Sequence, residues 1–482
     1  MISFFDAVVL GDELAGAVAA ALLARRGYRV LVLARAPQPE DTIGAHAFPR
    51  APLSIAGLES PVWKRLTSEL NLVQSLRRRV SANHPAWQLL LPDHRIDVGE
   101  ELPRELMREL PDEVSRFDAW TAAAARVGTI LDRVLASQVM LPPDGFWDRR
   151  DLKRVSVQMP PDEHELLDLL PPGRPLRLFA SLPARFASDL DTPGAVSHAR
   201  LGELYRQGTW SVQGGREGMR ALLYERVRAA AGEVRHDLRV RGLVVRRGRV
   251  VGVAVGDKDQ TIGCELVVAA EPAARVVELL PEEAPRRLRE AAAVRPASHR
   301  YRLHMIAPVS ALPDPLGRIA FAVRDPALPL EGANALSIHV TEAHGRDAVI
   351  TVEALARDIT AEGLLALRVE VRREVDRLLP FLGRHLVAAW SPHESAGAEG
   401  LGTAAPPPVA PDAVWALPAA PALGVCGVHY ATGMKGLYLA SRQVLPGLGV
   451  EGELCAGWCV TQLAVRKHRK KDGDKGRLLA DG

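Results

Sequence analysis

The residues best placed to do chemistry follow the first apolar run of the chain, in the stretch FDAVVLGDELAG (residues 5–16). Its glycines stand at the first and third positions of a G-x-G-x-x-G turn, and a glutamate stands at the second. Such a turn opens a helix whose free N–H groups and dipole attract the pyrophosphate of a dinucleotide. The residues expected to line this anion site are Gly11, Glu13, Leu14, Ala15 and Gly16.

Two positions depart from the pattern that a dinucleotide site requires. The second glycine normally lets the pyrophosphate approach the backbone, and the side chain of Glu13 both obstructs this path and repels an anion. The acid that normally ends the second strand and binds a ribose hydroxyl is replaced by Ala34, with Arg35 after it. By itself the turn therefore fits equally well an α/β unit whose glycines serve only backbone geometry.

The elements that would hold this turn form a βαβ unit. AVVL (7–10) is an apolar run of strand length, and AGAVAAALLARRG (15–27) has the alanine-rich composition of a helix ended by a glycine. YRVLVLA (28–34) is typical of a second buried strand.

Composition indicates a globular chain and excludes several classes of protein. The 482 residues predict two or three domains, and 47% hydrophobic with 25% charged residues is ordinary for a folded protein. A net charge of +3 is too small for an overall nucleic-acid binder. The four cysteines contain no C-x-x-C, and the histidines lack metal-ligand spacing, so we expect a cytoplasmic protein without a metal site. No apolar run reaches the roughly 20 residues of a membrane span.

The C-terminal segment 466–482 is the one strongly charged stretch. It carries seven Lys or Arg residues and three Asp. Its own net charge of +4 (7 − 3) exceeds the net charge of +3 of the whole chain. Such a tail is usually a solvated end, and the alternative is contact with an anionic membrane surface.

The α/β pattern is interrupted twice along the chain. Residues 61–204 are mainly helical in pattern, and residues 294–392 mix strands with one long helix. Between the two insertions, a glycine pair opens a helix that is followed by strands and a hairpin-like RRGR turn. After the second insertion the chain closes with LYLASRQVLPGLGVEG (437–452).

The order of these pieces resembles the phytoene desaturase and carotenoid isomerase branch of the FAD-dependent amine-oxidase-like superfamily, over nearly the whole chain. The matching residues are Gly214, Gly215 and Met219 in the second element and Pro446, Gly447, Gly449 and Gly452 in the closing element. The resemblance implies an adenine contact at Val240 and cofactor contacts at Gly447, Gly449 and Val450. The family's GGR phosphate segment is reduced to Gly44.

From this resemblance we expect an α/β chain with an FAD/NAD(P)-binding Rossmann-like domain and an inserted α+β substrate domain. The first domain is assigned to 1–60, 205–293 and 393–465, the second to 61–204 and 294–392, and a basic tail to 466–482. The implied cofactor is FAD, held at a degenerate site by the positions named above, Ala34 and Arg35 included.

The resemblance favours the first of three functions, because two of the three cofactor elements survive, and the second is the main alternative. The first is an FAD-dependent oxidoreductase in which an apolar substrate, held in a channel between the insertions, gives hydride to flavin. The second is a flavin-free relative that binds a lipid or a protein, as the Rab GDP dissociation inhibitors do on a similar fold. The third is an amine oxidase, with Tyr430 and Tyr438 as an aromatic cage at the flavin.

Overall fold

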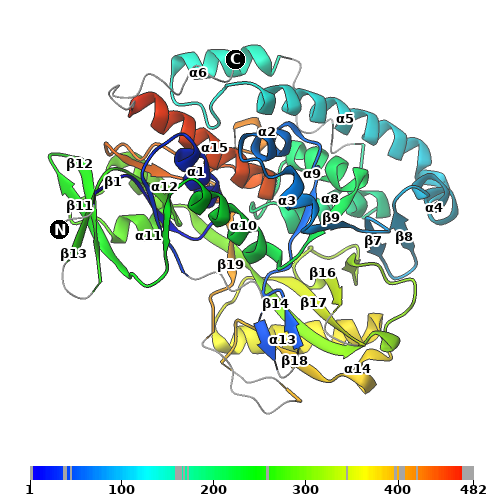
Figure 1. Ribbon diagram of the computed structural model, residues 1–482. Coiled ribbons are helices and arrows are strands. Elements are labelled where there is room, and N and C mark those ends of the chain that lie inside the picture. Colours follow the sequence, from blue (N-terminus) through cyan, green and yellow to red (C-terminus); the bar gives the residue numbers. More distant parts are fainter. Residues whose placement is uncertain are drawn as a thin grey trace.

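The structure of the chain is a computed structural model that describes residues 4–35, 41–43, 46–157, 166, 169–170, 173–256, 260–342, 346–395, 399–400, 408–418 and 422–468 (Figure 1). Within these residues, one sheet of seven strands and one of eight form the framework of the molecule. Helices cover the first sheet and form a separate layer above the second (Figure 1).

The seven-stranded sheet has the order β10-β2-β1-β13-β12-β11, with β20 beside β13. Its strands are β1 (Phe4–Gly11), β2 (Val30–Leu33), β10 (Glu233–Arg235), β11 (Val240–Arg246), β12 (Arg249–Val255), β13 (Gln260–Ala270) and β20 (Leu437–Leu439). The pairs of β1 with β2 and β13, of β2 with β10, and of β13 with β20 are all parallel. The expected α/β Rossmann-like fold class is therefore confirmed.

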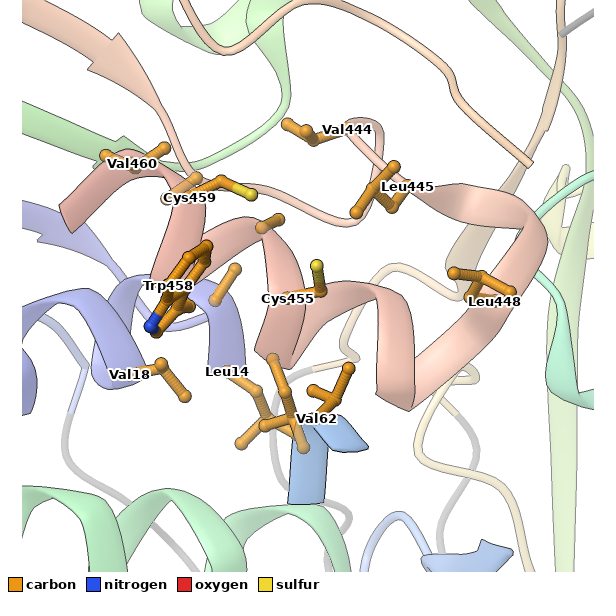
Figure 2. Packing of buried hydrophobic residues seen from close by; sticks show 14 of the residues in the cluster. Leu14, Val18, Val62, Val444, Leu445, Leu448, Cys455, Trp458, Cys459 and Val460 are labelled. Carbon is orange, nitrogen blue, oxygen red and sulfur yellow. The ribbon is translucent and has the colours of Figure 1, made fainter. Parts of the chain in front are cut away.

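Three helices pack together on this sheet: α1 (Leu14–Arg25), α10 (Gly215–Ala229) and α15 (Gly449–Lys467). Residues 14–24 of α1 are buried on every side, as expected for a helix enclosed in a core. Figure 2 shows Leu14 and Val18 of α1 beside Cys455 and Trp458 of α15. A side chain at Gly457 would come within 2.4 Å of the carbonyl oxygen of Ala15. Only glycine at this position lets α1 and α15 approach so closely.

The eight-stranded sheet has the order β18-β14-β17-β16-β15-β7-β8, with β19 beside β14. Its strands are β7 (Trp87–Leu90), β8 (Arg95–Val98), β14 (Arg295–Pro308), β15 (Ile319–Val323), β16 (Gly332–Glu342), β17 (Asp347–Ala356), β18 (Ala388–Trp390) and β19 (Asp412–Ala416). The long helix α13 (Ala361–Leu378) packs its apolar side on this sheet, and α14 (Leu382–His385) follows it. The sheet thus combines strands from both predicted insertions.

The helical layer is built from α2 (Pro61–Glu69), α3 (Val73–Arg77), α4 (Leu102–Glu109), α5 (Val114–Ala136), α6 (Phe146–Val155), α8 (Pro175–Ala187) and α9 (Ala195–Gln207). Smaller elements are the pair β3 (Asp41–Ile43) and β4 (His46–Phe48), the sheet of β5 (Ser54–Ala56), β9 (Thr209–Val212) and β6 (Val80–Ala82), and helices α11 (Ala273–Glu278) and α12 (Arg286–Ala292). Among the described residues, no helix combines the length and the apolar character that crossing a bilayer requires.

Several boundaries stay predictions. The segment 393–465, assigned to the Rossmann-like domain, also supplies β19, which pairs with β14 of the second sheet. Arg466 and Lys467 form the last residues of α15, and the rest of the predicted tail after residue 468 lies outside the described residues. Gly44, the remnant of the phosphate segment, also lies outside them.

Candidate functional site

A crevice of about 490 Å³ opens where the parallel strands β1, β2 and β13 end. This is the edge at which doubly wound sheets bind ligands, and the volume is in the range of small-molecule sites, roughly 300–1,000 Å³. Charged side chains dominate its lining. Six are arginines, namely Arg35, Arg50, Arg216, Arg220, Arg302 and Arg442. Five are acids, namely Asp12, Glu13, Glu217, Glu271 and Asp412.

Glu13 lies in the turn between β1 and α1, as expected, and its side chain lines the crevice. It precedes the first helical residue in an extended conformation, with φ −73° and ψ 150°. The carboxylate does not cap its own helix, because its Oε2 accepts a hydrogen bond of 2.6 Å from the backbone N–H of Arg442. Burial raises the pKa of Glu13 to about 8, although Arg442 opposes the shift. At neutral pH this carboxyl group is therefore mostly protonated.

Beside β2, ion pairs line the crevice. Asp12 accepts from Arg35 Nε at 2.9 Å and contacts Arg220 Nη1 at 3.2 Å. The backbone N–H of Ala34 donates to the carbonyl of Arg235, and the Ala34 carbonyl oxygen lies 3.0 Å from His236 Nδ1. Both backbone groups of Ala34 are thus engaged within the protein, and its side chain offers no ribose acceptor.

Beyond the turn, six side chains form a closed ring in which arginines and carboxylates alternate; Asp189, Arg300 and Arg302 are buried, and the other three are partly exposed. In order, the shortest distances are Arg442–Asp189 3.3 Å, Asp189–Arg300 3.7 Å, Arg300–Glu353 3.0 Å, Glu353–Arg302 3.1 Å, Arg302–Asp412 2.6 Å and Asp412–Arg442 3.4 Å. We call this set the charge ring. Its members come from β14, β17, β19, the residues after α8 and those after β20.

The charge ring is electrostatically balanced, with three cations and three carboxylates. Burial disfavours the ionised form of Asp412, but Arg442, Arg302 and Arg216 outweigh burial and hold the pKa of Asp412 well below its ordinary value. Burial likewise opposes ionisation of Glu353, and its arginine neighbours again lower the pKa. Both carboxylates are therefore ionised at neutral pH.

The charge ring stands between the crevice and a second cavity of about 100 Å³. Arg302, Asp412 and Arg442 line both spaces. The second cavity is partly apolar, with contributions from Phe186, Tyr205, Ile319, Phe321 and Val450. Arg216 also lines both spaces and forms an ion pair with Glu453 of α15. Burial raises the pKa of Glu453, against the effect of Arg216.

The closing glycines pack against protein atoms. A side chain at Gly447 would come within 2.6 Å of Val425 Cα, and one at Gly449 would come within 2.1 Å of the carbonyl oxygen of Ala187. Gly449 also has a positive φ of 55°, which favours glycine. Of the predicted closing residues, Val450 lines the second cavity.

The other predicted residues of the first motif serve the packing of the fold. Gly11 has φ +97°, and a side chain there would meet the carbonyl oxygen of Ala270 at 2.2 Å. A side chain at Gly16 would meet Ala270 Cβ at 2.2 Å, so this glycine sets the distance between α1 and β13. Leu14 and Ala15 are buried in the core.

Of the residues predicted from the sequence, the structure therefore brings Glu13 and Arg35 into the crevice and Val450 to the second cavity. Val240 begins β11 and, within the described part of the chain, is not among the residues that line either space. Cofactor contact by any of these positions stays a prediction.

Sequence reasoning missed most of the charged lining. Asp12 and Glu271 directly follow β1 and β13, so their position after buried strands was an available signal. Arg300 and Arg302 alternate along β14 and therefore point to one face of the sheet. Arg442 comes three residues after the end of β20. A charge placed after a parallel strand is a pointer to the ligand edge of the sheet.

Two further expectations concern aromatic residues and metals. Tyr430 and Tyr438 are buried, and neither lines the crevice or the second cavity. Tyr438 instead contacts His468 at the end of α15. In the described ranges, no cluster of three or more His, Cys, Asp or Glu side chains is arranged to hold a metal ion.

The crevice residues do not fit FAD in the binding mode that the resemblance implies. Glu13 and Asp12 stand where the pyrophosphate would approach α1, and Ala34 lacks the ribose acceptor. The glycines of the closing turn are covered by residues 187 and 425, and the charge ring separates the crevice from Val450. FAD that extended from α1 to Val450 would meet the ion pairs of the charge ring.

Comparison with known proteins supports the fold. No family model matches the chain, and no curated protein matches it. An oxidoreductase from Methanosarcina mazei is similar in structure, with a TM-score of 0.57 and 15% identity over 95% of this chain and 99% of that one. Cyclohexylamine oxidase from Brevibacterium oxydans IH-35A gives a TM-score of 0.57 and 12% identity over 96% and 99%. Putrescine oxidase bound to putrescine gives a TM-score of 0.56 and 14% identity over 96% of this chain and 99% of that one.

These likenesses span nearly the full length of each chain, and at such low identity they show a shared fold. The chain thus shares the fold of these oxidoreductases, and membership of the FAD-dependent amine-oxidase-like superfamily stays a prediction. Placement in the phytoene desaturase branch stays a prediction.

Proposed function

We propose that this chain is a flavin-free relative of the oxidoreductases whose fold it shares, and that it acts by binding a partner. The observation that carries the proposal is the charge ring. Its arginines and carboxylates occupy the route from the turn at Glu13 to the closing turn at Val450, which a flavin would have to follow. Each of its arginines contacts two carboxylates of this chain.

The energetic cost of admitting FAD supports this proposal. Separating one partner from a buried ion pair costs about 3–5 kcal/mol, because the other charge is left without compensation. That cost equals roughly two to four decades of affinity. The dinucleotide would also approach Asp12, which already pairs with Arg35 and Arg220. Arg35 and Arg220 in the crevice are thus already paired with a carboxylate of this chain.

The second cavity gives little support to a long apolar substrate. Its volume of about 100 Å³ is small against the roughly 300–1,000 Å³ of typical ligand sites. Its lining also includes Asp189, Glu353 and Glu453 together with arginines of the charge ring. An isoprenoid or lipid tail would have to displace buried charges to enter. Binding at the surface of the protein is therefore favoured over binding in a channel.

A second candidate is the FAD-dependent oxidoreductase of the phytoene desaturase type, which transfers hydride from an apolar substrate to flavin. The position of the crevice favours it, because the fold binds its ligands at this edge of the sheet. Arg50 and Arg220 also place cationic groups along the crevice, which is about 490 Å³ in volume. FAD would supply the redox chemistry in that case.

The two candidates are separated by a flavin-binding experiment. The wild-type protein is purified gently, its visible absorbance is recorded, and excess FAD is then titrated while flavin fluorescence is followed. We expect no flavin to copurify and no saturable binding. The double variant Glu13→Gly and Ala34→Glu restores the two missing features of the dinucleotide site.

Repair of these two positions leaves the charge ring intact, so we expect the double variant to bind no FAD either. Weak wild-type binding that tightens by about 1–3 kcal/mol per repaired position would support the oxidoreductase with a damaged site. Stoichiometric flavin in the purified wild type would refute the flavin-free proposal.

A further inference from the structure

Helix α6 presents aromatic and basic side chains to solvent. Phe146 and Trp147 at its start are 72% and 68% exposed, and their rings contact each other edge to face at 5.4 Å. Two adjacent exposed aromatic side chains form an apolar patch, and such patches mark interaction sites more often than single exposed residues do. The exposed basic residues of the helix are Arg149, Arg150, Lys153 and Arg154, and Leu152 is its buried residue. Figure 1 shows α6 on the outside of the helical layer, at the top of the view.

A cationic cavity of about 340 Å³ lies close to α6. Asp144, two residues before the helix, is one of its lining residues. Four strong cations line it, namely Arg249, Arg287, Lys435 and Lys467, together with His468. Asp144 is the one carboxylate in this lining within the described residues, and it pairs with Arg287 at 2.8 Å and with Lys467 at 3.9 Å. The cavity therefore carries a surplus of positive charge.

The end of α15 joins this region to the basic tail. Lys467 and His468 line the cavity, and the sequence continues with Arg469, Lys470 and Lys471 beyond the described residues. The aromatic pair, the cationic cavity and the start of the tail are thus linked through Asp144, which contacts Lys467 and lies next to α6 in the chain.

We propose that this face docks on an anionic lipid bilayer, with Phe146 and Trp147 entering the headgroup region and the cavity beside Asp144 receiving a lipid phosphate. The name docking face is used for three sets of residues together: Phe146 and Trp147, the exposed basic residues of α6, and the residues that line the cavity. This proposal rests on the proposed function, which makes the chain a binding protein, and it names an anionic bilayer as the partner. The crevice and the docking face are tested by different experiments, so each proposal can fail alone.

The combination of residues favours a bilayer over a soluble anion. Tryptophan and phenylalanine gain free energy at a bilayer interface, where the ring body is apolar and the surroundings are partly wet. Lysine and arginine add electrostatic attraction to an anionic leaflet, about 1 kcal/mol for each residue near the surface. Arg150 lies over the ring of Trp147 at 5.5 Å, so the charge and the aromatic side chain share one position on the surface. A soluble polyanion would require the cations and not the aromatic pair.

Cosedimentation with vesicles tests the proposal on the full chain. Vesicles of phosphatidylcholine alone are compared with vesicles of phosphatidylcholine and phosphatidylserine at low and high salt. We expect binding to the anionic vesicles only, and we expect high salt to weaken it. The double variant Phe146→Ala and Trp147→Ala is expected to bind at least about tenfold more weakly.

A second variant and two controls complete the test. Lys153→Ala with Arg154→Ala removes two exposed cations and is expected to weaken binding about 25-fold, or about fivefold for each cation. Phe381→Ala and Arg104→Ala change a 63% exposed aromatic residue and an 83% exposed arginine elsewhere on the surface, and we expect both to bind as wild type.

Three results would overturn the proposal. They are equal binding to neutral and anionic vesicles, undiminished binding by the aromatic variant, and equal losses in the controls. Loss in the cationic variant alone would indicate a surface for a soluble polyanion instead. Circular dichroism spectra matching wild type would show that the surface variants are folded.

Discussion

Replacement of Glu13 by Gln removes a titratable group from the crevice and keeps its shape. The amide oxygen can still accept the hydrogen bond from the backbone N–H of Arg442. In the folded wild type, burial raises the pKa of Glu13 from 4.5 to about 8. The folded state therefore retains a proton that the unfolded chain releases at lower pH.

The sign of the effect follows from proton linkage. Between about pH 4.5 and pH 8 the folded state binds more protons at Glu13 than the unfolded state does, so a rise in pH favours unfolding of the wild type. Below this range both states are protonated, and above it both are ionised. The Gln variant has no such group, so its free energy of unfolding lacks this pH dependence.

The size of the effect is set by the two pKa values. Linkage predicts that ionisation of Glu13 lowers the free energy of unfolding by about 1 kcal/mol at pH 5, about 3 kcal/mol at pH 7 and about 5 kcal/mol at pH 9. The difference between Glu13→Gln and wild type should therefore widen by about 4 kcal/mol from pH 5 to pH 9. The variant is expected to be the more stable protein at the alkaline end.

Urea unfolding at pH 5, 7 and 9, followed by far-ultraviolet circular dichroism, measures this difference. The control is Glu59→Gln, which neutralises a carboxylate that is 85% exposed and pairs with Lys64 on the surface. We expect the control to follow the wild-type pH dependence. If Glu13→Gln and wild type keep a constant difference across this range, Glu13 is ionised in the folded state and the reasoning about the crevice is wrong.

Two other substitutions test the packing and the charges that define the site. Arg442→Met should lower the free energy of unfolding by about 3–5 kcal/mol, because it leaves two carboxylates of the charge ring with one partner each. Adding Asp412→Asn should cost less than the sum of the two single variants in urea unfolding, and additive losses would contradict coupling through the ring. Gly16→Ala should cost about 1–3 kcal/mol because its Cβ would meet Ala270, whereas Gly145→Ala, with no atom within 4 Å of the added Cβ, serves as the control. Equal melting temperatures for the two glycine variants would refute the packing role of Gly16.

Local sequence patterns predicted the framework of the fold well. The run before Gly11 and the run after Gly27 became the parallel pair β1 and β2, because uninterrupted apolar strands are stable only when both faces are covered. The long helix expected in the second insertion became α13. The glycine spacing also placed Glu13 correctly at the turn. These features depend on residues that are close in sequence, so periodicity and turn chemistry reveal them.

The surroundings of the closing turn were not predicted from the sequence. Gly447 and Gly449 match a cofactor motif, yet the structure packs them on residues 425 and 187. A motif records the backbone that a position needs, and a bare backbone can face a ligand or another part of the chain. Whether the backbone of this turn faces a ligand or another segment depends on the path of the insertions. The closing motif does not contain that information.

The sequence by itself determined a chain with a dinucleotide-type βαβ start, two insertions and a glycine-rich closing turn. Tertiary structure alone decided what fills the space between them. The charge ring joins residues as far apart as Asp189 and Arg442, and apart from Arg300 and Arg302 on β14 its members lie on separate strands and loops. Isolated arginines and acids in a sequence are normally assigned to the surface, because burying one unpaired charge is costly. Folding brings three of each sign together, where each charge compensates its neighbours, and this places an ion network between the crevice and the second cavity.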